Sequence, residues 1–313
     1  MEISPAAVKT SATIGHESRR RRDWSGYLFL SPAFIFFGVF TFFPIIWTGI
    51  LSLQNYNVFA NQGTFIGFQN FSTALHSTEF MISLRDTLYF TFTTVPISVA
   101  LALLIATILN WENLKFATIL QTFFFIPYIV SSVGVALVWT WLFDTNFGLI
   151  NTALQVFGIA PVQWLTSSGA AMPALVIVSI WGTIGFPIIL FRAGLKAIPV
   201  EVQESASIDG ASATKVFWKI TFPMLAPTTL FVFVISIINA MQVFTIVDVM
   251  TQGGPLNATD VIVYYIFKEA FQFFNMGYGS AVAVILFLVI LGLTVIQIRG
   301  SRRYVYYEGE RNE

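Results

Sequence analysis

The chain contains six apolar runs that are each long enough to cross a lipid bilayer as a helix. They cover residues 27–51, 87–109, 119–143, 172–191, 227–247 and 278–298. A bilayer core takes about 20 residues of helix, and a backbone in hydrocarbon must satisfy its own hydrogen bonds. With 56% hydrophobic and 10% charged residues among 313, the chain is far too apolar for a soluble domain. The sequence therefore predicts an all-α membrane protein with six transmembrane helices.

The first 23 residues are polar and include four consecutive arginines, at positions 19–22. A charged start before an apolar run is also the pattern of a secretory signal, whose apolar region is about 7–15 residues long. The run at 27–51 exceeds that length and shows no small-residue cleavage site, so we interpret it as an uncleaved first span. The predicted organisation is an N-terminal tail (1–23), a six-span domain (24–298) and a C-terminal tail (299–313).

Basic residues indicate which side of the membrane each loop faces, because they concentrate on the cytoplasmic side. If both termini are cytoplasmic, 14 of the 16 Lys and Arg residues lie inside, and only Arg85 and Lys268 lie outside. The inside set is Lys9, Arg19, Arg20, Arg21, Arg22, Lys115, Arg192, Lys196, Lys215, Lys219, Arg299, Arg302, Arg303 and Arg311. The sequence therefore predicts two cytoplasmic termini and a cytoplasmic segment between the fourth and fifth spans.

That cytoplasmic segment, residues 192–223, carries the local signals of two short helices with a bend. Pro199 suits a first helical turn, where its missing N–H has no intrahelical partner. Gly210 is expected to end the first helix in the left-handed conformation, and Ser212 to cap the second helix. Pro223 closes the segment. Helices this short are marginal alone in water, so something should hold them.

A motif runs through this segment. The residues that carry it are Glu204, Ala206, Gly210, Ile220 and Pro223. This motif resembles the EAA loop of bacterial ATP-binding-cassette import permeases. It reads Glu-x-Ala, then three residues, Gly, nine residues and Ile-x-x-Pro. Ser205 stands where that motif usually has alanine and Phe222 where it usually has leucine, so both positions keep small or apolar character.

In that family the loop is a coupling helix that sits in a groove of the cytoplasmic ATPase subunit. The resemblance implies that this segment receives the movement of the ATPase subunit during its ATP cycle. The coupling residues that it implies are Glu204, Ser205, Ala206, Asp209, Gly210, Ala211, Ile220 and Pro223. Glu204 is expected to meet a basic residue of the ATPase, and Asp209 to cap or brace the bend. Without the resemblance, the segment would be interpreted as an amphipathic connector on the membrane surface.

The resemblance extends from about residue 27 to residue 298 and indicates the carbohydrate branch, similar to the maltose and glycerol-phosphate permeases. The stretches that carry it are 65–71, 125–128, 139–143 and 253–255. The fold that the family implies is the six-helix type I importer permease, with a cytoplasmic EAA coupling helix. The expected location is the cytoplasmic (inner) membrane of a bacterium or archaeon.

The same resemblance implies the partners of the chain. They are a second, related permease that completes a heterodimer, two ATP-binding-cassette ATPase subunits and an extracytoplasmic solute-binding protein. ATP and magnesium would be held by the ATPase, so no cofactor is expected in this chain. The outer loops near 53–84, 144–171 and 248–277 carry aromatics and amides that are candidate contacts for the solute-binding protein. A net charge of +0 gives no general attraction to nucleic acid.

A substrate pathway is predicted from two of the spans. The fourth holds Gly182, Gly185 and Pro187 near its middle, and irregular helix at that depth is tolerated where it lines a cavity. In the fifth span, Ser236, Asn239 and Val243 share one helical face. The predicted pathway residues are Gly185, Phe186, Pro187, Ile188, Ser236, Asn239, Gln242 and Val243.

The alternative is that these polar groups only hydrogen-bond between helices and that the glycines only permit close packing. We favour the cavity for the set, because similar sugar permeases place substrate contacts in these two spans. Amides, hydroxyls and aromatic faces suit a neutral di- or oligosaccharide, and no span has Lys or Arg near its centre. A glycerol-phosphate or polyol permease is the nearest alternative.

Enzymatic functions are disfavoured. There is no Gly-Lys dipeptide, so the chain lacks a phosphate loop, and it has no cysteine to act as nucleophile or thiolate ligand. His16 and His76 lie without a metal-ligand pattern, so no metal site is predicted. A secondary carrier driven by an ion gradient is the remaining alternative. That class would be expected to carry acids inside the spans or an inverted repeat, and neither is found in the predicted spans.

Overall fold

The computed structural model describes residues 25–110 and 116–301 of the chain. The predicted N-terminal tail and most of the C-terminal tail lie outside the described residues, as do His16 and Lys115. The predicted boundary at residue 298 is three residues short of the end of the last helix, Ser301. The chain divides into two units, residues 1–47 and 48–313, and each is described by itself.

The first unit contains α1 (Ser25–Phe37), a π-helical turn (Gly38–Phe42) and the start of α2 (Phe43–Ser52). Together they form an apolar helical stretch, Tyr27–Ser52, that matches the first predicted span. Its large apolar side chains are exposed, as Phe29 at 91% illustrates. Exposed apolar side chains on a helix of this length suit contact with hydrocarbon.

The second unit is organised around α4 (Thr78–Leu109), a helix of 32 residues. Ser77 caps its first turn by accepting a hydrogen bond from the Phe80 N–H at 3.3 Å. The helix therefore starts nine residues before the predicted span at 87–109. At about 1.5 Å per residue it is longer than the hydrocarbon core, so its first turns extend beyond the apolar stretch. Hydropathy alone missed this extension, because its residues are mostly polar.

The third and fourth predicted spans are not continuous helices. The third is α5 (Ala117–Ile129) and α6 (Ser132–Leu142), bent by 97°, so the prediction of one span at 119–143 was wrong in its geometry. The fourth is α8 (Ala171–Thr183) and α9 (Gly185–Ala197), bent by 46°. Pro187 explains the second bend, because it has no N–H to donate to the Thr183 carbonyl four residues earlier.

The last part of the chain supplies the remaining spans. They are α13 with α14 (Ala226–Met241 and Thr245–Met250) and α16 (Met276–Ser301). In the described part of the chain, four helical stretches are long and apolar enough to cross a membrane, or six if each bent pair counts as one. An all-α membrane fold with up to six spans is therefore confirmed.

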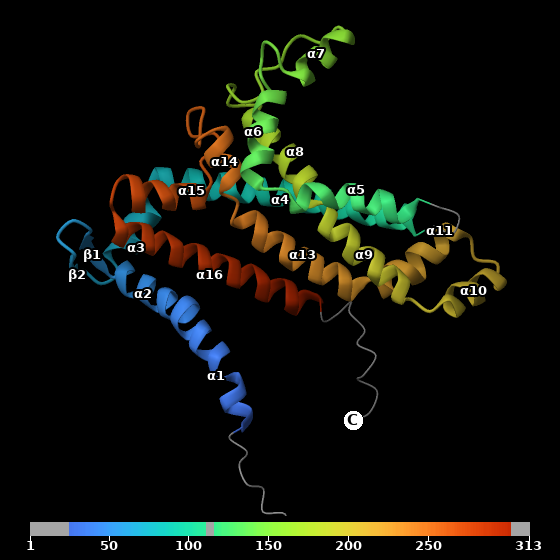
Figure 1. Ribbon diagram of the computed structural model, residues 1–313, viewed down its shortest axis with the longest axis horizontal. Coiled ribbons are helices and arrows are strands. Elements are labelled where there is room, and N and C mark those ends of the chain that lie inside the picture. Colours follow the sequence, from blue (N-terminus) through green and yellow to red (C-terminus); the bar gives the residue numbers. More distant parts are fainter. Residues whose placement is uncertain (1–24, 111–115, 302–313) are drawn as a thin grey trace, which may run out of the picture. The chain divides into compact units, whose positions relative to one another are not determined.

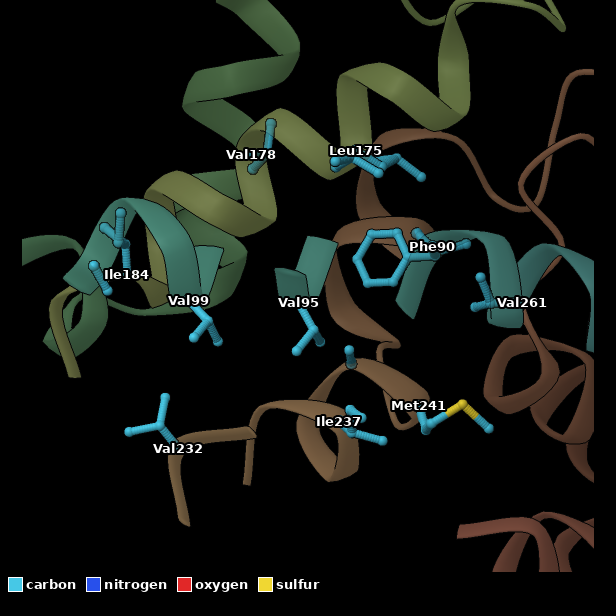
Figure 2. Packing of buried hydrophobic residues seen from close by; sticks show 14 of the residues in the cluster. Phe90, Val95, Val99, Leu175, Val178, Ile184, Val232, Ile237, Met241 and Val261 are labelled. Carbon is cyan, nitrogen blue, oxygen red and sulfur yellow. The ribbon is translucent and has the colours of Figure 1, made fainter. Parts of the chain in front are cut away.

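The core of the second unit lies on one side of α4, where α8, α9, α13 and α15 (Ile262–Phe267) pack against it. Figure 2 shows Phe90, Val95 and Val99 of α4 projecting into this core. Leu175 and Val178 of α8 and Val232 and Ile237 of α13 belong to the same buried cluster. The polar side chains discussed below therefore sit on helices whose apolar faces are locked together.

Two small structures lie outside these spans. A hairpin of β1 (Gln54–Asn57) and β2 (Gln62–Phe65) precedes α3 (Gln69–His76), and β1 and α3 both pack against α16. Residues 144–170 form a lobe that contains α7 (Leu149–Val156), which projects away from the spans in Figure 1. The buried Asn151 side chain ties this lobe together by bonding the Val162 backbone and the Trp164 indole N–H.

Candidate translocation cavity and coupling segment

A cavity of about 280 Å³ lies where α4, α8, α9 and α13 meet. Its walls also receive residues from α5, α6 and α14. The polar members of its lining are Thr94, Ser98, Tyr128, Ser132, Ser179, Thr183, Ser236, Asn239 and Thr245. Among the described residues that line it, none is charged. The cavity therefore offers hydroxyl, amide and aromatic groups to a ligand.

Five of the predicted pathway residues line this cavity, namely Phe186, Pro187, Ser236, Asn239 and Val243. The other three lie elsewhere. Gly185 faces α5, where a Cβ would overlap the Phe124 carbonyl and lie 2.7 Å from the Phe125 Cα. Ile188 is fully buried in the apolar core, and Gln242 follows the end of α13 on its exposed side. The helical face that carries Ser236, Asn239 and Val243 is thus the one turned to the cavity.

A stack of aromatic rings forms part of the cavity wall. The rings of Tyr128 and Phe186 lie 5.4 Å apart with an interplanar angle of 13°, and Tyr128 also stacks on Phe125 at 5.5 Å. Tyr128 follows Pro127 near the end of α5, and Phe186 precedes Pro187 near the start of α9. The two breaks in the spans therefore bring a flat apolar surface beside the polar face of α13.

Sequence reasoning overlooked two contributions to this cavity. Tyr128 was noted only as part of a family stretch, and Thr94 and Ser98 of α4 were not considered. The signal for α4 was present, because Thr87, Thr91, Thr94 and Ser98 recur at helical spacing within an apolar run. Tyr128 could not be placed from sequence, since its position depends on the break after α5.

The predicted coupling segment, residues 192–223 and below called the coupling segment, contains two short helices with a bend, as predicted. The first is α10 (Val200–Ile208), and the second consists of α11 (Ala213–Val216), a π-helical turn (Phe217–Thr221) and α12 (Phe222–Met224). Ser212 caps the second helix by accepting from the Lys215 N–H at 3.4 Å. Pro199 precedes α10 as its N-cap residue and does not enter the first turn.

The spacing of the coupling motif has a conformational reason. The Ala211 N–H donates to the Ala206 carbonyl at 3.0 Å, and the Gly210 N–H donates to the Ser207 carbonyl at 3.1 Å. These two bonds form the Schellman ending of a helix, which needs a left-handed residue at the position of Gly210. Gly210 has a φ of +77°, so the predicted left-handed turn is confirmed.

Nothing in the second unit buries α10. The structure gives it no buried residue, and Ile208 at its end is 86% exposed. Glu204, Ser205 and Asp209 are exposed as well, while Ala206 is half-buried. In the second helix, by contrast, Val216 and Thr221 are buried. The first half of the coupling segment therefore exposes most of its circumference, and only the face of Gln203 and Ala206 is partly covered.

The helices on either side of the coupling segment pack directly on each other. A Cβ on Gly194 of α9 would lie 2.7 Å from the Thr228 Oγ1 and 3.0 Å from the Leu225 Cδ2. Arg192 of α9 also donates a hydrogen bond to the Gln121 side chain of α5. The coupling segment is therefore attached to a tightly packed group of helices, α5, α9 and α13, which all contribute to the cavity wall.

A polar cluster lies at the end of α4 opposite to the coupling segment. The Asp260 carboxylate forms an ion pair with Lys268 at 2.7 Å, and the Ile262 N–H donates to the Thr87 Oγ1 at 2.8 Å. Burial raises the pKa of Asp260, and the bond from Lys268 opposes that shift. Asp86, which is 5% exposed, lies in the first turns of α4, one residue before the predicted span at 87–109, so the predicted spans themselves contain no acid.

Comparison with known proteins agrees with this architecture. The family model of the binding-protein-dependent transport system inner membrane component matches residues 86–303. The trehalose/maltose transport system permease protein of Thermococcus litoralis is 35% identical over 280 residues, which are 88% of this chain and 93% of that protein. The sn-glycerol-3-phosphate transport system permease protein of Agrobacterium fabrum is 33% identical, covering 90% and 96% respectively.

A solved structure has the same fold. The crystal structure of a bacterial ABC transporter involved in the import of the acidic polysaccharide alginate contains a chain that matches with a TM-score of 0.78 and 26% identity. The match covers 91% of this chain and 97% of that one. Sequence and fold agree in the same assignment. The chain therefore belongs to the family of binding-protein-dependent transport system inner membrane components and has the fold of an ABC importer permease, as the resemblance predicted.

Proposed function

We propose that this chain is the translocation-pathway subunit of an ATP-driven importer of a neutral di- or oligosaccharide. The observation that carries the proposal is the uncharged cavity, whose lining combines the Asn239 amide and the Ser236 hydroxyl with the Tyr128–Phe186 ring stack. Sugar hydroxyls both donate and accept hydrogen bonds, as amides and hydroxyls do. The apolar face of a sugar ring suits the face of an aromatic ring.

An anionic substrate would need charge compensation, and the described lining of this cavity supplies no Lys or Arg, although the first turns of α6 and α9 contribute to its wall. Buried phosphate and carboxylate groups are held by Arg or Lys, or by the N–H groups of helix N-termini. The relatives do not decide the substrate class, since one is a trehalose/maltose permease and another is a glycerol-3-phosphate permease. The uncharged lining favours the neutral sugar, and glycerol phosphate remains the alternative that the uptake experiment below decides.

The coupling role rests on the exposure of α10. A nine-residue helix without buried residues has little stability by itself, so its order and its exposed Ile208 fit a surface that a partner covers. We assign that partner as the ATPase, which would hold ATP and magnesium, with Glu204 facing one of its basic residues. Closure of two such subunits would move α10 and, through the packing at Gly194, the cavity-lining helices α9 and α13.

The remaining assignments follow from the same function. A second, related permease would complete the pathway as a heterodimer. A solute-binding protein would deliver the sugar to the side opposite to the coupling segment. The assignment of a solute-binding protein is supported by a solved relative, an alginate ABC transporter in complex with an alginate pentasaccharide-bound periplasmic protein. The distribution of basic residues supports an inner-membrane orientation with both termini in the cytoplasm.

The test is co-purification of the chain from its native membrane in mild detergent, with identification of the associated subunits. We expect an ATPase and a second permease, and we expect Glu204→Lys to lose the ATPase while keeping the permease. Glu201→Lys on the first turn of the same exposed helix is the matched control and should keep both. A chain that purifies alone and transports sugar in liposomes without ATP would identify a secondary carrier instead.

Uptake by the purified assembly then decides the substrate class. Proteoliposomes that contain the assembly, ATP and the binding protein are offered a labelled neutral disaccharide or labelled glycerol 3-phosphate. ATP-dependent accumulation of the disaccharide supports the proposal. Accumulation of glycerol 3-phosphate alone would assign the alternative and would require a cation from the second permease.

A further inference from the structure

A buried polar stripe runs along α4 from its outer end to the cavity. Its hydroxyl members are Ser83, Thr87, Thr91, Thr94 and Ser98, which are 0%, 0%, 0%, 4% and 4% exposed. They recur every three or four residues and therefore share one helical face. Polar groups that are buried within a spanning helix are costly unless they find partners. Helix packing alone therefore does not explain why these buried positions of α4 carry hydroxyl groups.

Two hydroxyls of this stripe differ from the hydrogen-bonded threonines of the spans, and outside the stripe only Thr229 of α13 shares their buried, unpaired state among the described threonines. A helical threonine can donate to the carbonyl four residues earlier, and Thr87, Thr107 and Thr140 do so at 2.7–2.9 Å. The Oγ1 atoms of Thr91 and Thr94 are buried and have no hydrogen-bond partner among the described residues. Any threonine in a helix can form this bond to the carbonyl four residues earlier. Because Thr91 and Thr94 do not form it, we interpret their hydroxyls as oriented toward a hydrogen-bond partner that is absent from this conformation.

The two ends of the stripe show where such a partner would come from. At the inner end, Thr94 and Ser98 line the cavity. At the outer end, Thr87 accepts the hydrogen bond from the Ile262 N–H that holds the start of α15 against α4. The unpaired Thr91 lies between them. The stripe therefore runs from the cavity toward the outer end of α4, where α15 packs against α4.

The cover over the stripe is residues 251–261 together with α15. Its inward contact is apolar, because Val261 is fully buried and belongs to the same cluster as Phe90 of α4 (Figure 2). Its polar links are few in the described part of the chain. They are the bond from Ile262 to Thr87, the contact of the Tyr265 hydroxyl with the Tyr278 hydroxyl of α16 at 3.0 Å, and the ion pair of Asp260 with Lys268, which directly follows α15. One carboxylate oxygen of Asp260 and one of Asp86 are also buried without a partner.

A protein with one conformation would gain nothing from unpaired hydroxyls at these positions, because valine has the same shape without the desolvation cost. A transporter has two conformations, and the groups that are unpaired when one half of the path is closed are paired when it opens. In an open conformation, water and sugar hydroxyls would supply the missing partners.

We propose that the face of α4 from Asp86 to Ser98 is the wall of the outer half of the sugar path, where Thr91 and Thr94 hydrogen-bond sugar hydroxyls and water. In the present conformation residues 251–261 and α15 close this half. The inference rests on the proposed import function and adds to it a second set of sugar contacts, between the cavity and the outer surface.

Cysteine accessibility tests the proposal directly, since the chain has no cysteine of its own. Thr91→Cys is introduced into the full assembly in proteoliposomes, and a membrane-impermeant thiol reagent is added from the outer side. Labelling of this chain is followed by mass spectrometry in the resting state and in the state trapped with a transition-state analogue of ATP hydrolysis. We expect a labelling rate about tenfold higher in the trapped state, because the open conformation is a minor species at rest.

The matched control is Ala102→Cys, which is also fully buried on α4 but lies beyond the cavity from the outer surface. It should stay unlabelled in both states. A Thr91→Cys chain that is unlabelled in both states, or labelled equally in both, would overturn the proposal. The wild-type assembly in the same vesicles must accumulate sugar with ATP. Failure of that uptake would reject the import function, whereas normal uptake with an inert Cys at position 91 rejects the outer path alone.

A second pair of variants separates binding from packing. Thr91→Val should leave the melting temperature of the assembly unchanged or raise it, because it removes an unpaired buried hydroxyl, while the apparent KM for sugar rises about fivefold. Thr87→Val removes the bond to Ile262 and should lower the melting temperature. If the Thr91→Val assembly has a lower melting temperature and an unchanged KM for sugar, the Thr91 hydroxyl has a purely structural role.

Discussion

Helix α10, for which we propose the coupling role, and the spanning helix α4 are opposites in how they relate to the rest of the chain. None of the residues of α10 is buried, whereas α4 is in contact with α8, α9, α13 and α15. Local signals define α10, namely a terminating glycine at the spacing that a Schellman ending requires. The role of the polar residues of α4, by contrast, depends on the elements that pack around them. An exposed helix can be interpreted from its own sequence, and a buried one cannot.

Both helices also carry groups that the isolated chain leaves unsatisfied, but of opposite kinds. On α10 these are apolar, as the 86% exposure of Ile208 shows, and they call for a partner protein. On α4 they are the unpaired hydroxyls of Thr91 and Thr94, which call for a polar ligand or water. Substitutions should therefore have different readouts in the two regions. Those near α10 should affect coupling, and those in the packed spans should affect stability or sugar affinity.

The largest effect is expected in the packed core, from Gly185→Ala. The added Cβ would overlap the Phe124 carbonyl, and backbone on both sides must shift. We expect a loss of about 2–3 kcal/mol of stability, seen as a lower melting temperature of the assembly in detergent. Gly292→Ala on α16 meets no atom within 4 Å and is the control. Equal melting temperatures of the two variants would show that α5 and α9 are not in close contact.

Gly210→Ala should act on coupling and leave the core intact. A left-handed alanine costs about 1–2 kcal/mol, so the end of α10 unwinds or shifts, while no buried residue is touched. We expect sugar-stimulated ATPase activity to fall strongly with little change in the melting temperature of the permease. Ser207→Ala, one turn inside the same exposed helix, should retain coupling. Normal stimulation in Gly210→Ala would show that the turn has no part in it.

Asn239→Ala tests the cavity itself. The side chain faces the cavity from α13, and the loss of one or two hydrogen bonds to sugar is worth about 1 kcal/mol, or roughly a fivefold higher KM for uptake. Gln242→Ala is the matched control, because this amide lies off the cavity-lining face. Assembly should be unaffected by either change. An unchanged KM in Asn239→Ala, or an equal rise in both variants, would remove Asn239 from the sugar site.

The smallest effect is a pH dependence at the outer end of α4. Burial raises the pKa of Asp260 above its usual 3.8, so the folded chain holds that proton more tightly than the unfolded chain. The free energy of unfolding should therefore decline as pH rises from the usual pKa through the raised one, and be constant above it. Asp260→Asn should flatten this pH dependence of the melting temperature. An identical pH profile of Asp260→Asn and wild type would show that Asp260 does not titrate in this range.

The hydropathy of the chain was sufficient to predict an all-α membrane fold, and the motif spacing was sufficient to predict the family. The positions of individual pathway residues were only partly predictable. Ser236, Asn239 and Val243 were grouped correctly on one face, since a helical period is a local property. Gly185 and Ile188 were assigned to the pathway, yet they face α5 and the core. The rotation of α9 about its axis depends on what packs against it.

What the sequence by itself determined about this protein is local. Apolar runs, prolines, the left-handed turn at Gly210 and the cap at Ser212 each depend on residues a few positions apart. The tertiary structure alone decided the cavity, the aromatic stack of Tyr128 on Phe186 and the covered polar stripe of α4. Each of these joins residues from helices that are distant in the chain. Their contact depends on where α5 and α8 break and on how those helices pack.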